Sequence, residues 1–172
     1  MLGERILVIG SPGSGKSTFA RALGELTDLP LLYLDRLFWN ADRTTVENQV
    51  FDQRLEQAMA QSQRRIMDCN YSRTLDRRLA RCQRVFFLDY PVEVCLEGVR
   101  ARRGTVRPDI PWVKTEEDPE FMDYIRTFPQ QQRPKILALQ EEHPEKNWVV
   151  FRFREQADAY LQGLREGKAG KA

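Results

Sequence analysis

The sequence of 172 residues has only three cysteines and a single histidine. The cysteines are widely spaced, odd in number and without a C-x-x-C pair, so neither a disulfide framework nor a zinc site is expected. Isolated cysteines of this kind are typical of small core side chains in a reducing compartment. The histidine, His143, precedes Pro144 in a polar stretch. We therefore expect it on the surface, which excludes a mechanism based on a histidine base.

Long hydrophobic runs and an excess of one charge are also missing. No segment approaches the roughly 18 apolar residues of a membrane helix, and the first residues, with an early glutamate and a short apolar run, predict no signal peptide. The 27 basic and 25 acidic residues leave a net charge of only +2, which gives no reason to expect a nucleic-acid or membrane partner. A cytoplasmic protein is predicted.

What the sequence does contain fits one α/β domain. A chain of this length can bury roughly two-thirds of the surface that its unfolded form exposes, and 41% of its residues are hydrophobic. We predict a single domain over residues 1–166. Residues 167–172 contain only glycine, lysine and alanine, and this composition predicts a disordered tail.

Short apolar runs alternate with helical patterns along the chain. The runs are nearly continuous in Ile, Leu, Val and Phe, as in strands covered on both faces of a parallel sheet. They predict strands at 5–9, 31–34, 65–67, 85–88 and 148–151. Apolar side chains at helical spacing follow, beginning at Phe19, Val46, Leu75, Val92, Phe121 and Ala157. Thr44-x-x-Glu47 predicts a capping box for the second of these helices, and Pro91 a first turn for the fourth. Such alternation predicts a doubly wound sheet with functional residues just after its strands.

Residues 102–118 interrupt this alternation. They contain Gly104, Pro108 and Pro111, and they show little helical or strand spacing. A connection of this length within one domain is usually a mobile lid or a disordered insertion. We favour a lid because of its position relative to the site described next.

The strongest signal is the stretch of residues 10–17, which fits the phosphate-loop pattern G-x-x-x-x-G-K-[ST] between a predicted strand and a predicted helix. Glycines let backbone N–H groups approach a polyphosphate, and the helix start adds a positive dipole end. Lys16 would meet the β- and γ-phosphates of ATP, and the Ser17 hydroxyl would bind Mg²⁺. The residues predicted to bind the nucleotide are Gly10, Ser11, Pro12, Gly13, Ser14, Gly15, Lys16, Ser17 and Thr18.

Acidic residues follow three of the predicted strands. Asp68 follows the third strand, where a carboxylate can hold a metal-bound water, so we assign it with Ser17 to the metal. Asp89, after the fourth strand, is a rival, although it is better placed to cap the helix that Pro91 begins. Asp35, after the second strand, could orient the hydroxyl or phosphate of an acceptor, or it could simply cap a turn.

Aromatic and basic residues extend these predictions. Phe38 and Trp39 wall the acceptor pocket or belong to the core. Nine arginines lie between residues 73 and 107, against four acids. We predict that Arg100, Arg102 and Arg103, at the start of the lid segment 102–118, contact phosphate. Arg100 and Arg103 are assigned as catalytic residues together with Lys16, Asp35 and Asp68. The acceptor site is predicted to comprise Asp35, Trp39, Asn70, Tyr71 and Arg77. We expect Arg78 and Arg81 on a solvated helix face.

The order of these motifs resembles the bacterial "topology modulation" (FlaR-like) proteins, a branch of the adenylate-kinase-like P-loop kinases. The residues that carry the resemblance are the phosphate loop, L-D-x-L-F-W at 34–39, D-x-N-Y at 68–71, F-L-D-x-P at 87–91 and R-x-x-x-R-P-D at 103–109. The resemblance implies a three-layer P-loop fold with a five-stranded parallel sheet in the order 2-3-1-4-5, a nucleotide on residues 10–18, and a small acceptor over the second and third strands. The family typically has glycine where this chain has Cys69.

These observations predict a Mg²⁺-requiring kinase of the nucleoside/nucleotide-kinase type, which transfers the γ-phosphate of ATP to a small acceptor. An alternative is a DNA-associated protein that uses ATP as a switch and affects DNA topology, although no DNA- or RNA-reading motif is present. A regulatory GTPase-like module is a third possibility, but there is no N-K-x-D-type signature for guanine. A nucleic-acid partner is therefore not expected.

Overall fold

The structure is a computed structural model that describes residues 2–169. Its core is one parallel sheet in the order β2-β3-β1-β4-β5, which confirms the predicted doubly wound α/β architecture and strand order. Each predicted strand is present, with bounds within a residue of those expected. The strands are β1 (Arg5–Gly10), β2 (Leu31–Tyr33), β3 (Arg65–Asp68), β4 (Arg84–Leu88) and β5 (Asn147–Phe151).

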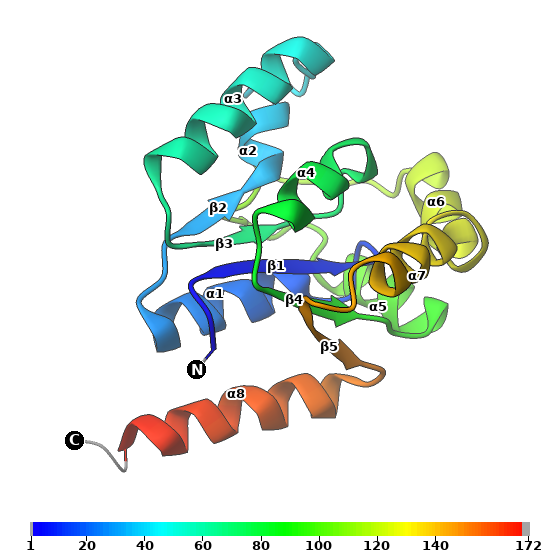
Figure 1. The fold of residues 1–172 in the computed structure, drawn as a ribbon. Coiled ribbons are helices and arrows are strands. Elements are labelled where there is room, and N and C mark those ends of the chain that lie inside the picture. The colour runs from blue at the N-terminus through cyan, green and yellow to red at the C-terminus, as the bar shows by residue number, and fades with distance from the viewer. Residues whose placement is uncertain (1, 170–172) are drawn as a thin grey trace.

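Helices occupy both faces of the sheet (Figure 1). They are α1 (Lys16–Thr27), α2 (Leu34–Phe38), α3 (Asn48–Gln61), α4 (Leu75–Ala80), α5 (Val92–Ala101), α6 (Pro119–Gln131), α7 (Arg133–Glu142) and α8 (Arg154–Ala169), with a 3₁₀ turn at Ser72–Thr74. The short α2 and α7 were not predicted. Ile136 is the buried residue of α7, so this helix has no apolar stripe from which its periodicity could be recognised in the sequence.

Alternate residues of β1 point to opposite faces and divide the core in two. On one face, Ile6 and Val8 pack with α1, α5 and α8, and the ring of Phe19 lies 5.1 Å from that of Phe86 between centroids. On the other face, Leu7 and Ile9 pack with α3, α4 and α7. Figure 1 shows α1 and α8 on one side of the sheet and α3 and α4 on the other. The result is a three-layer domain.

Two local predictions differ from the structure. The capping box is wrong: α3 begins at Asn48 without a side-chain cap, and Thr44 instead bonds Asp42 within a turn, at 3.0 Å through its N–H. The turn is closed by an isolated bridge between Trp39 and Thr45. The predicted tail starts too early, because α8 continues to Ala169; positions 170–172 lie outside the described residues.

The segment between α5 and α6 contains no helix or strand, as its composition predicts. It folds back on itself, since the N–H of Gly104 donates to the carbonyl of Lys114 at 2.7 Å and Arg103 pairs with Glu117. The segment thereby forms a closed loop whose residues face the carboxyl end of the sheet. Over residues 2–169, none of the helices combines the length and the apolar character needed to cross a bilayer.

Candidate active site

The phosphate loop connects β1 to α1 through a turn that only small residues can form. Gly13 and Gly15 have φ values of 83° and 85°, in the left-handed region that favours glycine. A Cβ on Gly13 would lie 1.9 Å from the carbonyl oxygen of Cys95 on α5, and a Cβ on Gly98 would lie 2.1 Å from the carbonyl oxygen of Gly13. The turn therefore sits directly against α5, with the amino end of α1 facing the space above it.

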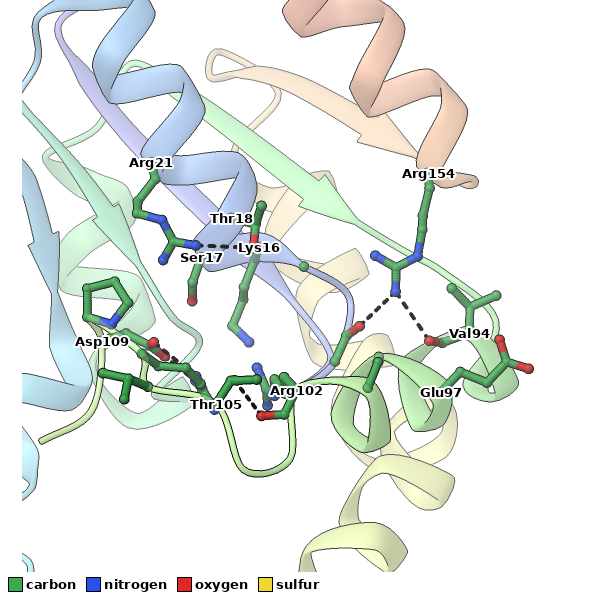
Figure 2. A pocket seen from close by; sticks show the side chains of 17 residues that line it. Lys16, Ser17, Thr18, Arg21, Val94, Glu97, Arg102, Thr105, Asp109 and Arg154 are labelled. Carbon is green, nitrogen blue, oxygen red and sulfur yellow. Dashed lines mark hydrogen bonds and ion pairs between the residues drawn. The ribbon is translucent and has the colours of Figure 1, made fainter. Parts of the chain in front are cut away.

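Two side chains from distant parts of the chain hold this loop. Asn70, after β3, accepts from the N–H of Gly10 at 3.0 Å and donates to the carbonyl of the same residue at 2.7 Å. Arg154, at the start of α8, donates to the carbonyls of Gly13 at 3.0 Å and Val94 at 3.3 Å (Figure 2). The predicted acceptor role of Asn70 is not supported, because both polar atoms of its amide are engaged by the phosphate loop.

Asp68 ends β3 beside the start of α1 and is almost fully buried. Burial raises the pKa of its carboxyl group to about 6, although Lys16 and a hydrogen bond from Ser17 act in the opposite direction. One carboxylate oxygen, Oδ1, is buried without a hydrogen-bond partner among the described residues. A buried oxygen next to the Ser17 hydroxyl is the donor set expected for a cation that also contacts phosphate. The structure thus places the two predicted metal ligands together.

A cavity of about 610 Å³ lies over the phosphate loop (Figure 2). Lys16, Ser17 and Thr18 form one wall, and Arg102, Thr105 and Asp109 of the closed loop face them. The cations that line this cavity are Lys16, Arg21, Arg102, Arg107 and Arg154. Such a concentration of positive charge around a helix start suits a polyphosphate.

A second cavity, of about 650 Å³, opens over the ends of β2 and β3. Asp35 of α2 lies in it and accepts a hydrogen bond of 2.6 Å from the hydroxyl of Tyr71. Trp39 and Trp112 meet edge to face at 5.1 Å between ring centroids, so an aromatic pair joins the end of α2 to the closed loop. The ammonium of Lys114 lies 4.0 Å from the centroid of the Phe121 ring. This cavity combines two indoles and several cations with five carboxylates, those of Asp35, Asp109, Glu116, Glu117 and Asp118.

The arginines singled out from the sequence differ in whether they line these cavities. Arg77 pairs with Asp52 and Glu56 of α3 and lines neither of these cavities, which does not support its place in the acceptor site. Arg100 also lies outside both linings and pairs with Glu117. Arg103 shares that glutamate but does line the second cavity. Arg81, as predicted, is on an exposed helix face, where it pairs with Glu56.

Arg102, one of the arginines expected to contact phosphate, lines both cavities together with Arg107 and Asp109, to which no role was assigned from the sequence. Burial, together with the charge of Arg107, lowers the pKa of Arg102 to about 10. Burial by itself raises the pKa of the Asp109 carboxyl group, but the hydrogen bonds and charge of Arg107, together with the charge of Arg102, lower the pKa below its usual value. The motif Arg107-Pro108-Asp109 was visible in the sequence, but nothing in it indicated that these residues face the phosphate loop.

The rival metal ligand, Asp89, has a different environment. Its carboxylate accepts from Nε of Arg133 on α7, at 2.9 Å, and pairs with Arg152 after β5. It neither lines the two cavities nor caps α5, whose N-cap residue, Pro91, has no side-chain cap bond. The predicted capping role is therefore wrong, and Asp89 instead ties β4 to α7 and to the end of β5.

The sheet order and the phosphate loop define a P-loop α/β fold. No protein-family model and no curated protein matches this chain. Solved structures do match. The chain is similar to a shikimate kinase from Bacteroides thetaiotaomicron, with a TM-score of 0.61 and 19% identity over 94% of this chain and 96% of that one. It is also similar to a sugar kinase from Janibacter sp., with a TM-score of 0.54 and 17% identity over 91% of this chain and 89% of that one. At such identities the likeness establishes the fold.

Proposed function

We propose that the protein is a kinase of the adenylate-kinase-like type, which transfers the γ-phosphate of ATP to a small hydroxylated acceptor. The observation that carries this proposal is that the two cavities share one wall. The residues that line both of them are Lys16, Ser17, Arg102, Thr105, Arg107 and Asp109. A phosphate donor in the first cavity and an acceptor in the second would meet at this wall, where positive charge is concentrated.

The residues on the donor side fit ATP with Mg²⁺. The glycine turn offers backbone N–H groups, and Lys16 reaches into the cavity from the first turn of α1 (Figure 2). Ser17 Oγ and the unpartnered oxygen of Asp68 would hold the cation. When bound, Mg²⁺ supplies charge neutralisation at the β- and γ-phosphates. Arg102 and Arg107 would neutralise the phosphoryl group as it moves, and this role replaces the one predicted for Arg100.

On the acceptor side, Asp35 is the group that can orient a hydroxyl. Its Oδ1 is fixed by Tyr71, so the carboxylate has a set direction into the cavity. A hydroxyl that donates to Asp35 would direct its oxygen at the γ-phosphorus; a new O–P bond forms as the bond to the bridging oxygen of ADP breaks, and the hydroxyl proton leaves through the carboxylate. Trp39 and Trp112 would flank the body of the acceptor.

Membership of the FlaR-like family, which the quoted motifs support, is part of this proposal. A cytoplasmic location is also part of it. The alternative, a nucleotide-switched protein on DNA, gains no support from the charge distribution. Arg73, Arg77 and Arg81 form the basic row most suited to track a phosphate backbone, yet each is paired with Asp52 or Glu56 of α3. Paired arginines release few counterions on binding, so DNA affinity from this face should be weak.

The proposal is tested by measuring ADP release from Mg·ATP in the presence of nucleosides, nucleoside monophosphates, sugars and hydroxylated carboxylic acids, after subtraction of the rate with ATP alone. We expect at least one class to accelerate ADP release. Lys16→Ala should reduce the accelerated rate by roughly 100- to 1,000-fold, because a charge that meets the transferring group is lost. The fold should persist, since Lys16 is not part of either hydrophobic core.

Lys135→Ala is the matched control, because Lys135 is an exposed lysine of α7 that lines neither the donor nor the acceptor cavity. Wild-type transfer rates by Lys16→Ala would overturn the proposal. Salt-sensitive binding of duplex DNA in the nanomolar range, with no acceptor found, would favour the alternative.

A further inference from the structure

The three residues after β3 connect the two halves of the site. Asn70 bonds the backbone of Gly10 at the start of the phosphate loop, and Tyr71 bonds Asp35 in the acceptor cavity. Cys69 lies between Asp68 and Asn70 and lines the acceptor cavity. Residues 69–71, called the β3 loop below, therefore join the phosphate loop to the acceptor carboxylate Asp35.

The backbone of the β3 loop is strained. Cys69 has a φ of 122° and Tyr71 a φ of 37°, both in the range that side-chain-bearing residues rarely adopt. Conformations of this kind are unfavourable and persist only where the surroundings enforce them. Short-range structure supports only one end of the loop, where the N–H of Thr74 in the 3₁₀ turn donates to the carbonyl of Tyr71 at 2.9 Å.

A buried guanidinium contacts the whole loop. Arg78 of α4 is fully buried, although sequence analysis placed it on a solvated face. It donates to the carbonyl of Cys69 at 2.8 Å, to that of Tyr71 at 3.1 Å, and also to that of Asn70. Every carbonyl of the β3 loop thus points at one side chain. Only the planar fork of arginine offers this many donors in a fixed arrangement.

Holding this cation in the interior is costly. Arg78 forms no ion pair with a carboxylate among residues 2–169, and its Nε has no hydrogen-bond partner there. Burial lowers the pKa of Arg78 to about 10. A buried charge compensated only by carbonyls is less favourable than an apolar side chain of the same volume. A role confined to stability therefore does not explain an arginine at this position.

We propose that Arg78 is a positioning residue that fixes the β3 loop and so couples the phosphate loop, through Asn70, to the acceptor carboxylate Asp35, through Tyr71. This inference rests on the proposed function, which gives the phosphate loop its role toward the phosphate donor and Asp35 its role toward the acceptor. Arg78 itself touches neither cavity. Its effect on nucleotide binding should travel through the two hydrogen bonds between Asn70 and Gly10.

The test measures the dissociation constant of Mg·ADP by calorimetry for wild type, Arg78→Lys, Asn70→Ala and the double variant. Lysine keeps the charge but cannot reach three carbonyls at once. We expect each single variant to weaken Mg·ADP binding about tenfold, as loss of supporting hydrogen bonds around a binding group commonly does. The double variant should bind Mg·ADP as tightly as the single variant with the lower affinity, because both changes break the same connection.

Arg81→Lys is the matched control, since Arg81 lies one turn further along and is exposed; its Mg·ADP affinity should equal that of wild type. Arg78→Met removes the buried charge at similar volume and provides a second variant that is expected to fold. It should show the same loss of affinity as Arg78→Lys, at a temperature where circular dichroism shows it to be folded.

Wild-type Mg·ADP affinity in folded Arg78→Lys and Arg78→Met would overturn the proposal, even if their thermal midpoints were lower. Additive losses in the double variant would also overturn it, because they would show that Arg78 does not act through Asn70. If neither arginine variant folds, Arg78 is required for the fold itself and the positioning role is refuted. Failure of the wild type to bind Mg·ADP would instead refute the proposed function, and this inference with it.

Discussion

The donor and acceptor sides of the site are built by different means. The donor side is one continuous strand–turn–helix stretch, and its contact with α5 is made by backbone atoms at Gly13 and Gly98. The acceptor side is assembled from α2, the β3 loop and the closed loop between α5 and α6, and side-chain contacts such as Tyr71–Asp35 join them. A site made of backbone constrains neighbouring residue types, so it leaves a readable motif. A site made of distant side chains leaves only short, separate patterns, such as Asp35 and Trp39 after β2.

The largest effect should come from placing a single methyl group between the phosphate loop and α5. In Gly98→Ala the new Cβ would lie 2.1 Å from the carbonyl oxygen of Gly13, so the loop must shift. Overpacking of this kind costs about 1–3 kcal/mol, and we expect Mg·ADP affinity to fall about tenfold or more. Calorimetry measures the affinity, and a urea titration measures the free energy of unfolding.

Gly163→Ala is the corresponding control. Gly163 is a helical glycine of α8 with no atom within 4 Å of the new Cβ. Alanine there should raise the free energy of unfolding by about 0.5–1 kcal/mol through helix propensity and leave Mg·ADP affinity unchanged. Equal behaviour of the two variants would show that the phosphate loop does not depend on contact with α5.

A smaller effect, confined to the acceptor side, is expected for Tyr71→Phe. The ring contacts with Phe38 and Phe51 are kept, and only the hydroxyl that donates to Asp35 is lost. We expect a loss of about 1–2 kcal/mol in the free energy of unfolding, as for a hydrogen bond to a charged group, and a lower kcat with the acceptor found by the ADP-release assay. Mg·ADP affinity should change by less than about twofold. A tenfold weaker Mg·ADP complex would contradict the separation of the two sides.

The smallest effect concerns the ion pairs of Asp52 on α3 with Arg73 of the 3₁₀ turn and Arg77 of α4. Hydrogen bonds from Arg73 and Arg77 lower the pKa of Asp52 to about 2, against an ordinary value of 3.8. The charged carboxylate therefore stabilises the fold fully above about pH 4, and this contribution is lost as the pH falls through 2. Because the partners are nearly half exposed, Asp52→Asn should cost only about 0.5–1 kcal/mol at pH 7.

This difference between Asp52→Asn and wild type should shrink between pH 4 and pH 2 and vanish below it, as followed by urea unfolding at each pH. Glu4, whose pair with Arg64 is exposed on both partners, offers a comparison: Glu4→Gln should have a smaller effect at pH 7. A difference that grows on acidification would mean that Asp52 does not owe its pKa to the two arginines.

The contrast between the two sides also explains what could be predicted from the sequence. Continuous apolar runs identified all five strands, because both faces of a parallel sheet are covered. The phosphate loop was identified from its motif, and Asp35, Trp39 and Asp68 from their positions after strands. The position of each of these residues is determined by the strand that precedes it, and that strand can be recognised from the local sequence.

Arginines were the main source of error. Arg78 is fully buried, whereas Arg81, three residues later, is exposed. The helical spacing does separate them, because Arg78 lies between Leu75 and Cys82 on the apolar stripe, but its charge led to the wrong expectation. Arg102 lines both cavities, whereas Arg100 lines neither and pairs with Glu117. For these two arginines the difference depends on the fold of the closed loop, which no spacing rule contains.

The grip of Arg154 on the phosphate loop has a consequence for biosynthesis. The ribosome makes the glycine turn among the first twenty residues, but the guanidinium that bonds the carbonyls of Gly13 and Ser14 belongs to position 154. Strand β5, which must pair with β4 before α8 can dock, is also translated late. A nascent chain thus carries the phosphate-loop motif without the bonds that shape it until Arg154 has been translated and α8 has docked.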